Sequence, residues 1–346
     1  MSHASEYGFT ACADLADKLR QQINTQIFGQ KHLVDEALCC FLVEGHILIT
    51  GAPGLAKTTL VRIFSQSLGL QFGRVQFTPD LLPSDIIGTD ILNLDAVSGK
   101  RSFDFSKGPV FTNLMLADEI NRASPRTQSA LLEAMQEKNC TVNGITHKLP
   151  QPFMVFATQN PFESEGTFPL PEAQLDRFML HSLVDYPDAA AEDRILIAHN
   201  SNRLAGEFQA KPELKPILTL EDTLQLVATC RQISIADELL HVVRDLVRST
   251  RPTDASCPEE IKPCIWYGAG PRAGISLVST AKAMALIDKS ETVRWKHIER
   301  LAKPVLRHRL RLTPEGVNNG YTEDSLVDRL LGQIVEKYDF IAKGIA

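Results

Sequence analysis

The chain has 346 residues, a length that favours two domains over one. Its net charge of −6 at pH 7 argues against a general electrostatic attraction to nucleic acid or to an anionic membrane surface. Apolar residues make up 44% of the sequence, but no apolar run approaches the roughly 20 residues that span a bilayer. The N-terminus lacks the apolar region of a signal peptide. We therefore expect a cytoplasmic protein with no membrane insertion.

Five short apolar segments predict the strands of a largely parallel sheet. Helical patterns alternate with these segments, which is the signature of βαβ units. The third and fourth segments are apolar throughout, as expected for central strands that are covered on both faces. The segments are residues 46–50, 74–77, 113–117, 153–158 and 178–184. The first part of the chain is therefore expected to form an α/β domain.

Two β-hairpins are expected to interrupt this α/β pattern. The first is predicted between residues 90–94 and 102–105, with its turn around Ser98-Gly99. The second is predicted over residues 141–146, where Asn143-Gly144 supplies the two positive-φ residues of a type I′ turn. Both hairpins are excursions from an otherwise compact domain.

The character of the sequence changes after Tyr186-Pro187. The remainder is mostly amphipathic helix interrupted by prolines, and residues 237–248 and 275–287 have helical apolar spacing. We place the boundary near residue 190, with a loose connector at about 200–216. This predicts an α/β domain over residues 1–190 and a helical domain with a C-terminal tail over residues 191–346.

A glycine-rich motif gives the clearest indication of function. It follows the predicted strand that ends at Thr50 and opens a predicted helix, which is the setting that a phosphate-binding loop requires. Lys57 would reach the β- and γ-phosphates of ATP, and the Thr58 hydroxyl would help to hold Mg²⁺. Ala56 departs from the strict pattern, which has glycine before the lysine, and a glycine-rich turn with an accidental Lys-Thr is the alternative. The residues assigned to ATP binding are Gly51, Ala52, Pro53, Gly54, Leu55, Ala56, Lys57, Thr58 and Thr59.

Two carboxylates follow the third predicted strand. Asp118 and Glu119 would lie at the carboxyl edge of the sheet, where open α/β folds bind ligands. Asp118 suits the Mg²⁺ shell, and Glu119 is placed to orient or polarise the attacking water. Asn160 follows the next strand and could position the same water or detect the γ-phosphate, although an ordinary turn at Asn160-Pro161 fits equally well. Capping of the next element is the alternative for the carboxylates, and the phosphate-binding loop outweighs it.

Two arginines are candidates for stabilising the charge that develops during phosphoryl transfer. Arg177 lies just before the last predicted strand, and Arg272 opens a helix of the second domain. A guanidinium suits this task because it is planar and stays charged. From position alone, each arginine is better explained as a surface ion-pair residue.

Five motifs together resemble the MoxR family of AAA+ ATPases, over roughly residues 28 to 312. The resemblance implies an α/β fold, in which an AAA+ P-loop core with a mostly parallel sheet precedes an all-helical lid. It also implies that the subunits assemble into a ring, which is usually hexameric. It also implies that alanine at position 56 is ordinary. The motifs are residues 51–59, LADEINR at 116–122, ATQNP at 157–161, PEAQLDRF at 171–178 and GPRA at 270–273, where Ser-Pro-Arg is more usual than Gly-Pro-Arg.

The resemblance assigns the family's site residues to matching positions of this sequence. It also implies that the two predicted hairpins correspond to the family's two hairpin insertions, which would face the pore or the substrate. The resemblance also implies a partner with a von Willebrand A domain and a role in maturation or metal-cofactor loading of a protein complex. By resemblance, Lys57 and Thr58 belong to Walker A, Asp118 and Glu119 to Walker B, Asn160 is sensor 1, Arg177 is an arginine finger reaching into the neighbouring subunit, and Arg272 is sensor 2.

Two other functions remain as alternatives to a chaperone-like remodeller. One is a nucleic-acid motor, which the acidic charge disfavours. The basic run at residues 303–311 is better explained as a solvated helix face or an intersubunit contact. The other is a nucleotide-gated scaffold with little turnover. The presence of both Glu119 and Arg177, the candidate catalytic residues, disfavours this alternative.

Overall fold

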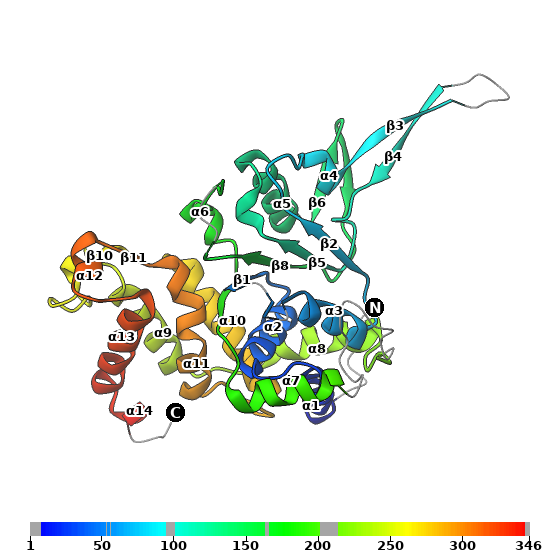
Figure 1. Ribbon diagram of the computed structural model, residues 1–346. Helices are drawn as coiled ribbons and strands as arrows, with labels where there is room; N and C mark the ends of the chain where they lie inside the picture. Colours follow the sequence, from blue (N-terminus) through cyan, green and yellow to red (C-terminus); the bar gives the residue numbers. More distant parts are fainter. Residues whose placement is uncertain are drawn as a thin grey trace.

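The computed structural model describes residues 8–52, 54–55, 57–94, 101–162, 166–200 and 214–342. The fold consists of an α/β core and a largely helical lid that pack against each other (Figure 1). The two parts share one continuous set of buried apolar side chains.

The centre of the core is a parallel sheet whose strand order is β2-β5-β8-β1-β9. Every neighbouring pair in this order is parallel. The third and fourth predicted strands become β5 and β8 in the middle of the sheet, and all residues of β5 are buried. The prediction of a mostly parallel sheet is thus confirmed. The strands are β1 (Ile47–Gly51), β2 (Phe72–Gln76), β5 (Leu114–Asp118), β8 (Met154–Gln159) and β9 (Leu180–Val184).

Helices cover both faces of the sheet because successive strand residues point to opposite sides. Ile47 and Ile49 belong to the apolar cluster that includes α1, α2 and α3, whereas Leu48 belongs to the cluster that includes α4 and α5. Ser124 caps α5 as its Oγ accepts a hydrogen bond from the Thr127 amide. The helical elements of the core are α1 (Phe9–Asn24), α2 (Lys31–Leu42), α3 (Lys57–Leu68), α4 (Pro83–Ile87), η1 (Ile120–Arg122), α5 (Pro125–Glu137), α6 (Glu172–Leu175) and α7 (Ala189–Asn200).

Both predicted hairpins are present. β3 (Gly88–Leu94) pairs with β4 (Arg101–Lys107), and the two strands project from the core as an arm (Figure 1). β6 (Asn139–Val142) pairs with β7 (Ile145–Lys148), and positive φ angles at Asn143 (48°) and Gly144 (80°) form the predicted turn. The turn expected around Ser98-Gly99 lies outside the described residues.

The lid is helical except for one short pair of strands. β10 (Ile265–Tyr267) and β11 (Arg311–Leu312) pair in antiparallel fashion, which the expectation of an all-helical lid did not include. Ile265 of β10 is buried, as is Leu310 next to β11, and the pairing satisfies backbone groups of both strands. Most of the connector expected at 200–216 lies outside the described residues. The helical elements of the lid are α8 (Leu220–Gln232), α9 (Asp237–Ser249), η2 (Lys262–Cys264), α10 (Pro271–Ile287), α11 (Trp295–Leu306), η3 (Arg307–Arg309), α12 (Pro314–Asn318), α13 (Glu323–Lys337) and α14 (Asp339–Ala342).

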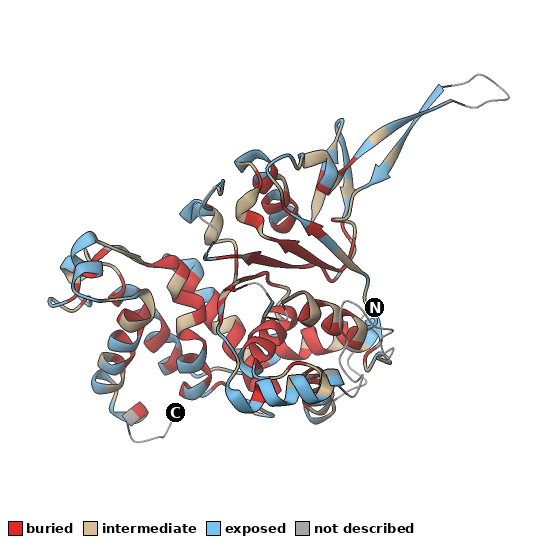
Figure 2. Cartoon of the chain, viewed as in Figure 1, coloured by how far each residue is buried: buried red, intermediate tan, exposed pale blue. Residues whose placement is uncertain are grey.

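The N-terminal helices α1 and α2 join the lid to the core. Leu38 and Phe41 of α2 share a buried cluster with Leu277 of α10, and α1 packs against α3, α8 and α10. Figure 2 shows the resulting buried interior, with exposed residues on the hairpin arm and on the outer faces of helices such as α7 and α13. Because α1 and α2 pack on both parts, the division near residue 190 stays a prediction.

A buried histidine is expected to make the fold sensitive to mild acid. His46 Nδ1 accepts a hydrogen bond from the Val155 amide (3.0 Å), so the ring is neutral and Nε2 donates to the Met135 carbonyl (3.1 Å). Burial lowers the pKa of His46 to about 4, whereas an unfolded histidine titrates near 6.5. Only the unfolded state takes up this proton between those values, so the stability contributed by neutral His46 is present above pH 6.5 and is lost as the pH falls towards 4.

Urea unfolding measured from pH 7 to pH 4.5 tests this expectation. The free energy of unfolding should fall towards acid, and His46→Gln should remove about 1.4 kcal/mol per pH unit from that slope, which is the value of one proton. His241→Gln, at an exposed position on α9, is the matched control and should keep the wild-type slope. If His46→Gln left the dependence of the unfolding free energy on pH unchanged, His46 would not be the source of the acid sensitivity.

Candidate active site

The glycine-rich motif forms a loop between β1 and α3. A Cβ atom on Gly51 would lie 2.7 Å from the Val184 carbonyl oxygen, so this position requires glycine. Gly54 has φ +82°, which also favours glycine. Lys57, Thr58 and Thr59 form the first turn of α3, where free N–H groups favour an anion. Pro53 and Ala56 lie outside the described residues, so the departure at position 56 is not tested.

Lys57 spans the loop and lies in the field of the two carboxylates. Its Nζ donates to the Gly51 carbonyl over 2.6 Å. Burial lowers the pKa of Lys57, and the negative charges of Asp118 and Glu119 oppose that shift. The ammonium therefore lies between the loop and the carboxyl edge of β5, where the phosphates of a nucleotide would replace its contact with Gly51.

Asp118 is the last residue of β5 and is held by two donors. Thr158 Oγ1 donates to its Oδ1 (2.6 Å), and Arg74 Nη2 donates to its Oδ2 (2.8 Å). The register of the sheet explains these contacts, because β2 and β8 flank β5. Neither partner could be identified from the sequence, in which their position on strands next to β5 was the only signal.

Glu119 adopts a left-handed conformation with φ +56°, which turns the chain sharply at the end of β5. Its backbone amide donates to Thr158 Oγ1 (2.9 Å). Its carboxylate accepts hydrogen bonds from Gln76 Nε2 (2.8 Å) and from Arg122 Nη1 (2.9 Å). A strained backbone held by several partners is a common feature of functional sites. The carboxylate thus has a fixed orientation before any ligand binds.

Asn160 reaches the same edge of the sheet. Thr50 is paired with Gln159 across β1 and β8, so Asn160 lies next to the start of the phosphate-binding loop. Asn160 is buried, and its Oδ1 accepts a hydrogen bond from the Phe162 amide (3.1 Å). The turn considered as the alternative is therefore present at this residue, and the residue lies beside the start of the loop.

The donor set at this edge fits Mg²⁺. Thr58 and Asp118 offer a hydroxyl and a carboxylate, which are the hard oxygen ligands that Mg²⁺ prefers. Within the part of the chain that the structure describes, no group of three His, Cys, Asp or Glu side chains could hold a metal ion. A cation here would take its remaining ligands from phosphates and water, as Mg²⁺ usually does.

Arg177 and Arg272 lie at the opposite edge of the sheet. With His46 and Met179, which precede β1 and β9, they line a pocket of about 250 Å³. The strands are parallel, so this edge is separated from Gly51 by the length of β1, about 13 Å. Arg177 Nη1 donates to the Leu132 carbonyl (2.9 Å), and Arg272 Nη1 lies 3.4 Å from Asp176 Oδ2.

The structure thus brings together some of the predicted residues and separates others. The loop, both carboxylates and Asn160 meet at the carboxyl edge, whereas the two arginines meet each other at the amino edge. Neither arginine can contact a phosphate held by the loop of its own chain in this conformation.

The basic run at residues 303–311 lies at the interface of core and lid, and the expectation of a solvated face is wrong for its central part. Arg307 and Arg309 are largely buried, with side-chain exposures of 11% and 3%. Each lysine and arginine of the run pairs with a carboxylate of the same chain. Arg307 and Arg309 belong to the 3₁₀ turn η3, which packs into the interface, whereas Lys303 and Arg311 lie outside it and are more exposed (37% and 42%). The pairs are Lys303–Asp328, Arg307–Asp324, Arg309–Asp176 and Arg311–Glu172.

Known proteins share this architecture. Residues 46–180 match the model for the ATPase family associated with various cellular activities (AAA), and residues 259–330 match the AAA lid domain. The chain is 38% identical to Chaperone MoxR1 of Mycobacterium tuberculosis over 90% of its own length and 79% of that protein. It is 32% identical to Protein MoxR of Paracoccus denitrificans, with coverages of 84% and 87%. The structure of a "putative ATPase" from Cytophaga hutchinsonii superposes with a TM-score of 0.84 at 36% identity, covering 93% and 95% of the two chains.

The fold and the loop define an AAA-type ATPase, as the two family models indicate. The chain belongs to the MoxR family of AAA+ ATPases. Among its described helices, we find none with the length and apolar character needed to cross a bilayer.

Proposed function

We propose that this protein hydrolyses ATP with Mg²⁺ at sites completed between neighbouring subunits of a ring, most simply a hexamer. The observation that carries the proposal is the separation of the arginines from the loop. The loop and carboxylates lie at one edge of the sheet, and Arg177 and Arg272 lie at the other. Head-to-tail packing of copies brings one edge against the other and closes into a ring.

Each residue then has a distinct task in hydrolysis. Lys57 and the amides at the start of α3 hold the phosphates, and Glu119 orients the attacking water together with Asn160. Thr58 and Asp118 would hold Mg²⁺, which neutralises charge on the phosphates when bound. Arg177 and Arg272 of the next subunit would stabilise the charge that develops in the transition state. Because Arg272 lines the same pocket as Arg177, we propose that sensor 2 acts in trans together with the arginine finger, and not on the nucleotide of its own chain.

The hairpin arm supports a chaperone-like role in which ATP turnover remodels a protein complex. Apolar side chains remain exposed on β3 and β4, at Ile91 (49%), Leu92 (50%) and Phe103 (73%). Exposed apolar side chains of this kind mark protein interaction sites. The second hairpin supports the arm, because Asn143 Nδ2 donates to Asp90 Oδ2 (2.6 Å). We propose that the arm contacts the client, and that a von Willebrand A-domain protein and metal-cofactor loading belong to this activity.

The two alternatives receive less support. A nucleic-acid motor would use the basic run, but Arg307 and Arg309 are engaged with carboxylates inside the chain. A scaffold with little turnover would not need the three hydrogen bonds that fix Glu119, two of which its carboxylate accepts and one of which its amide donates to Thr158.

Substitution of Lys57 by alanine tests the nucleotide site. Loss of the ammonium between the loop and the carboxylates should abolish ATP binding or turnover, because no other described cation is bonded to Gly51. Binding of a fluorescent ATP analogue and phosphate release would both be measured. Lys289→Ala, which removes a half-exposed ammonium paired with Asp14 on the protein surface, is the control. Full activity of Lys57→Ala would exclude the phosphate-binding loop.

A further inference from the structure

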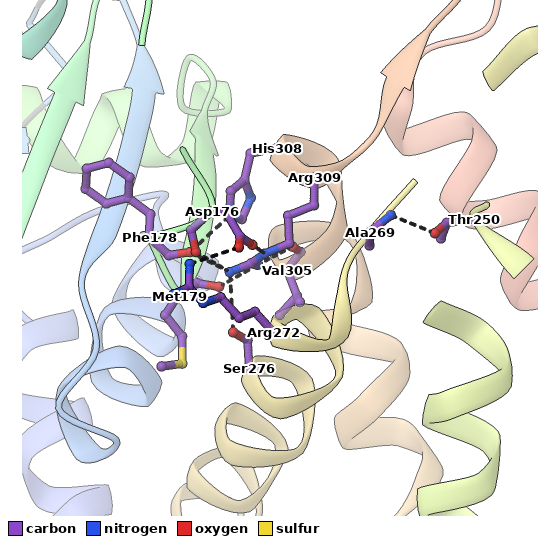
Figure 3. A network of polar contacts seen from close by, with 10 residues as sticks. All are labelled: Asp176, Phe178, Met179, Thr250, Ala269, Arg272, Ser276, Val305, His308 and Arg309. Atoms are coloured by element: carbon purple, nitrogen blue, oxygen red, sulfur yellow. Dashed lines mark hydrogen bonds and ion pairs between the residues drawn. The ribbon is translucent and has the colours of Figure 1, made fainter. Parts of the chain in front are cut away.

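Arg309 makes six hydrogen bonds at the interface of core and lid. It belongs to η3, and only 3% of its side chain is exposed. Figure 3 shows its guanidinium surrounded by acceptors from three separate segments of the chain. It donates to Asp176 Oδ1 (2.8 Å), Asp176 O (3.4 Å), Phe178 O (2.7 Å), Met179 O (3.2 Å), Val305 O (2.6 Å) and Ser276 Oγ (3.3 Å).

Three of these acceptors are backbone carbonyls of residues that flank Arg177 in the sequence. The carbonyls of Asp176, Phe178 and Met179 lie on either side of it in the sequence, and all three bond to Arg309. The neighbouring His308 adds a further contact, since its Nε2 lies 3.0 Å from the Phe178 carbonyl. The turn that carries Arg177 is therefore held from the lid.

The same contacts also reach Arg272. Ser276 lies one helical turn after Arg272 on α10, so its bond to Arg309 fixes the beginning of that helix. Asp176 pairs with Arg309 through Oδ1 and contacts Arg272 through Oδ2. One buried guanidinium and one carboxylate thus connect Arg272 to the residues on either side of Arg177. Figure 3 draws Arg309, Asp176 and Arg272 in this arrangement.

We propose that Arg309 is a positioning residue for catalysis in the neighbouring subunit, where it sets the placement of Arg177 and Arg272 without contacting the nucleotide. This inference rests on the proposed function. Because Arg309 joins α10 and η3 of the lid to residues 176–179 of the core, a movement of the lid would move the arginine finger with it. The lid of one subunit would then control hydrolysis in the next.

Lysine cannot replace Arg309 in this role. Lysine keeps the charge but has three donors at one point, whereas the guanidinium has five donors in a planar fork that matches several acceptors. Arg309→Lys should therefore leave Arg177 present but displaced. A displacement of about 1 Å at a reacting group can cost about 10²-fold in rate. We expect kcat to fall by about 10- to 100-fold, with the KM for ATP changed by less than about threefold, because the variant's own loop is intact.

Subunit mixing separates positioning in trans from a structural role. Arg309→Lys subunits keep an intact loop and Glu119, and Glu119→Gln subunits keep an intact Arg177 and Arg309. Rings that contain both should regain turnover, because a Glu119→Gln subunit supplies its finger to an Arg309→Lys site. Arg177→Ala mixed with Glu119→Gln is run in parallel as the reference, and co-assembly is verified by mass.

Each result of this mixing has a definite meaning. Rescue of both Arg177→Ala and Arg309→Lys supports the inference. Rescue of Arg177→Ala alone would show that Arg309 acts within its own subunit, which overturns the inference and leaves the proposed function standing. Rescue of neither, despite co-assembly, would overturn the proposed function and the inference with it. Wild-type turnover of Arg309→Lys would also overturn the inference.

Two further variants control for loss of folding. Arg307→Lys changes the other arginine of η3, whose side chain is 11% exposed and bonds to Asp324 and to the His181 carbonyl. It should keep kcat within about threefold of wild type, and a loss equal to that of Arg309→Lys at matched Tm would overturn the inference. Asp176→Asn keeps the shape of a partly exposed partner and should lower kcat and be rescued in mixing as Arg309→Lys is.

Discussion

Replacement of Arg177 by alanine is expected to lower ATP turnover per subunit by about 10³-fold while ATP affinity changes little, since a finger supplied across an interface contributes about 10³–10⁵ in rate. The side chain lies at the amino edge of the sheet, about 13 Å from the loop of its own chain. Under the proposed function, its loss would remove a contact from the neighbouring site and leave the chain's own phosphate contacts unchanged.

Turnover per subunit across a wide range of protein concentration is the measurement that checks this. Wild-type turnover should rise steeply as rings assemble, and Arg177→Ala should lack that rise. Arg329→Ala, a half-exposed arginine paired with Glu260 on the lid, should behave as wild type. Flat turnover that is indifferent to Arg177, in a protein that a sizing column shows to be monomeric, would exclude the ring mechanism.

The sheet could be predicted from the sequence because its strands are short apolar runs between turn residues. The strand predicted at 46–50 is found at 47–51, and the other strand bounds differ by two residues or fewer. The second hairpin could be predicted for a local reason as well, because Asn143 and Gly144 supply the positive φ angles themselves. Where the decisive interaction lies within a few residues, the local sequence was sufficient to predict the element.

The contacts around the site could not be predicted, because they join residues that are far apart in the chain. Arg74 and Asp118 are 44 residues apart, and Arg309 and Asp176 are 133 apart. A run of cations is usually solvated, since arginine is rarely buried without a partner. The partner of Arg309 becomes visible only when η3 is placed against residues 176–179. The placement of both arginines at the amino edge depends on the same long-range packing.

Glu119→Gln is expected to retain ATP and to lower hydrolysis by about 10²–10⁴-fold, the usual contribution of a general base. Glutamine keeps the length of the side chain, and its carbonyl oxygen can still accept the hydrogen bonds that Gln76 and Arg122 now donate to Oε2. The left-handed turn at position 119 and the amide bond to Thr158 do not depend on the carboxylate. The substitution thus removes the negative charge that we propose orients and polarises the attacking water, while the surrounding geometry and Lys57 remain.

Retention of ATP and release of phosphate, measured on the same preparation, distinguish this result from a damaged site. ATP should remain bound to Glu119→Gln rings long after wild-type rings have converted it. Glu133→Gln, at an exposed position on α5, should hydrolyse ATP as wild type does. Near wild-type hydrolysis by Glu119→Gln would show that another residue acts as the general base. Negligible turnover by the wild-type protein itself, with ATP bound, would instead favour the nucleotide-gated scaffold, in which assembly depends on ATP binding and not on its cleavage.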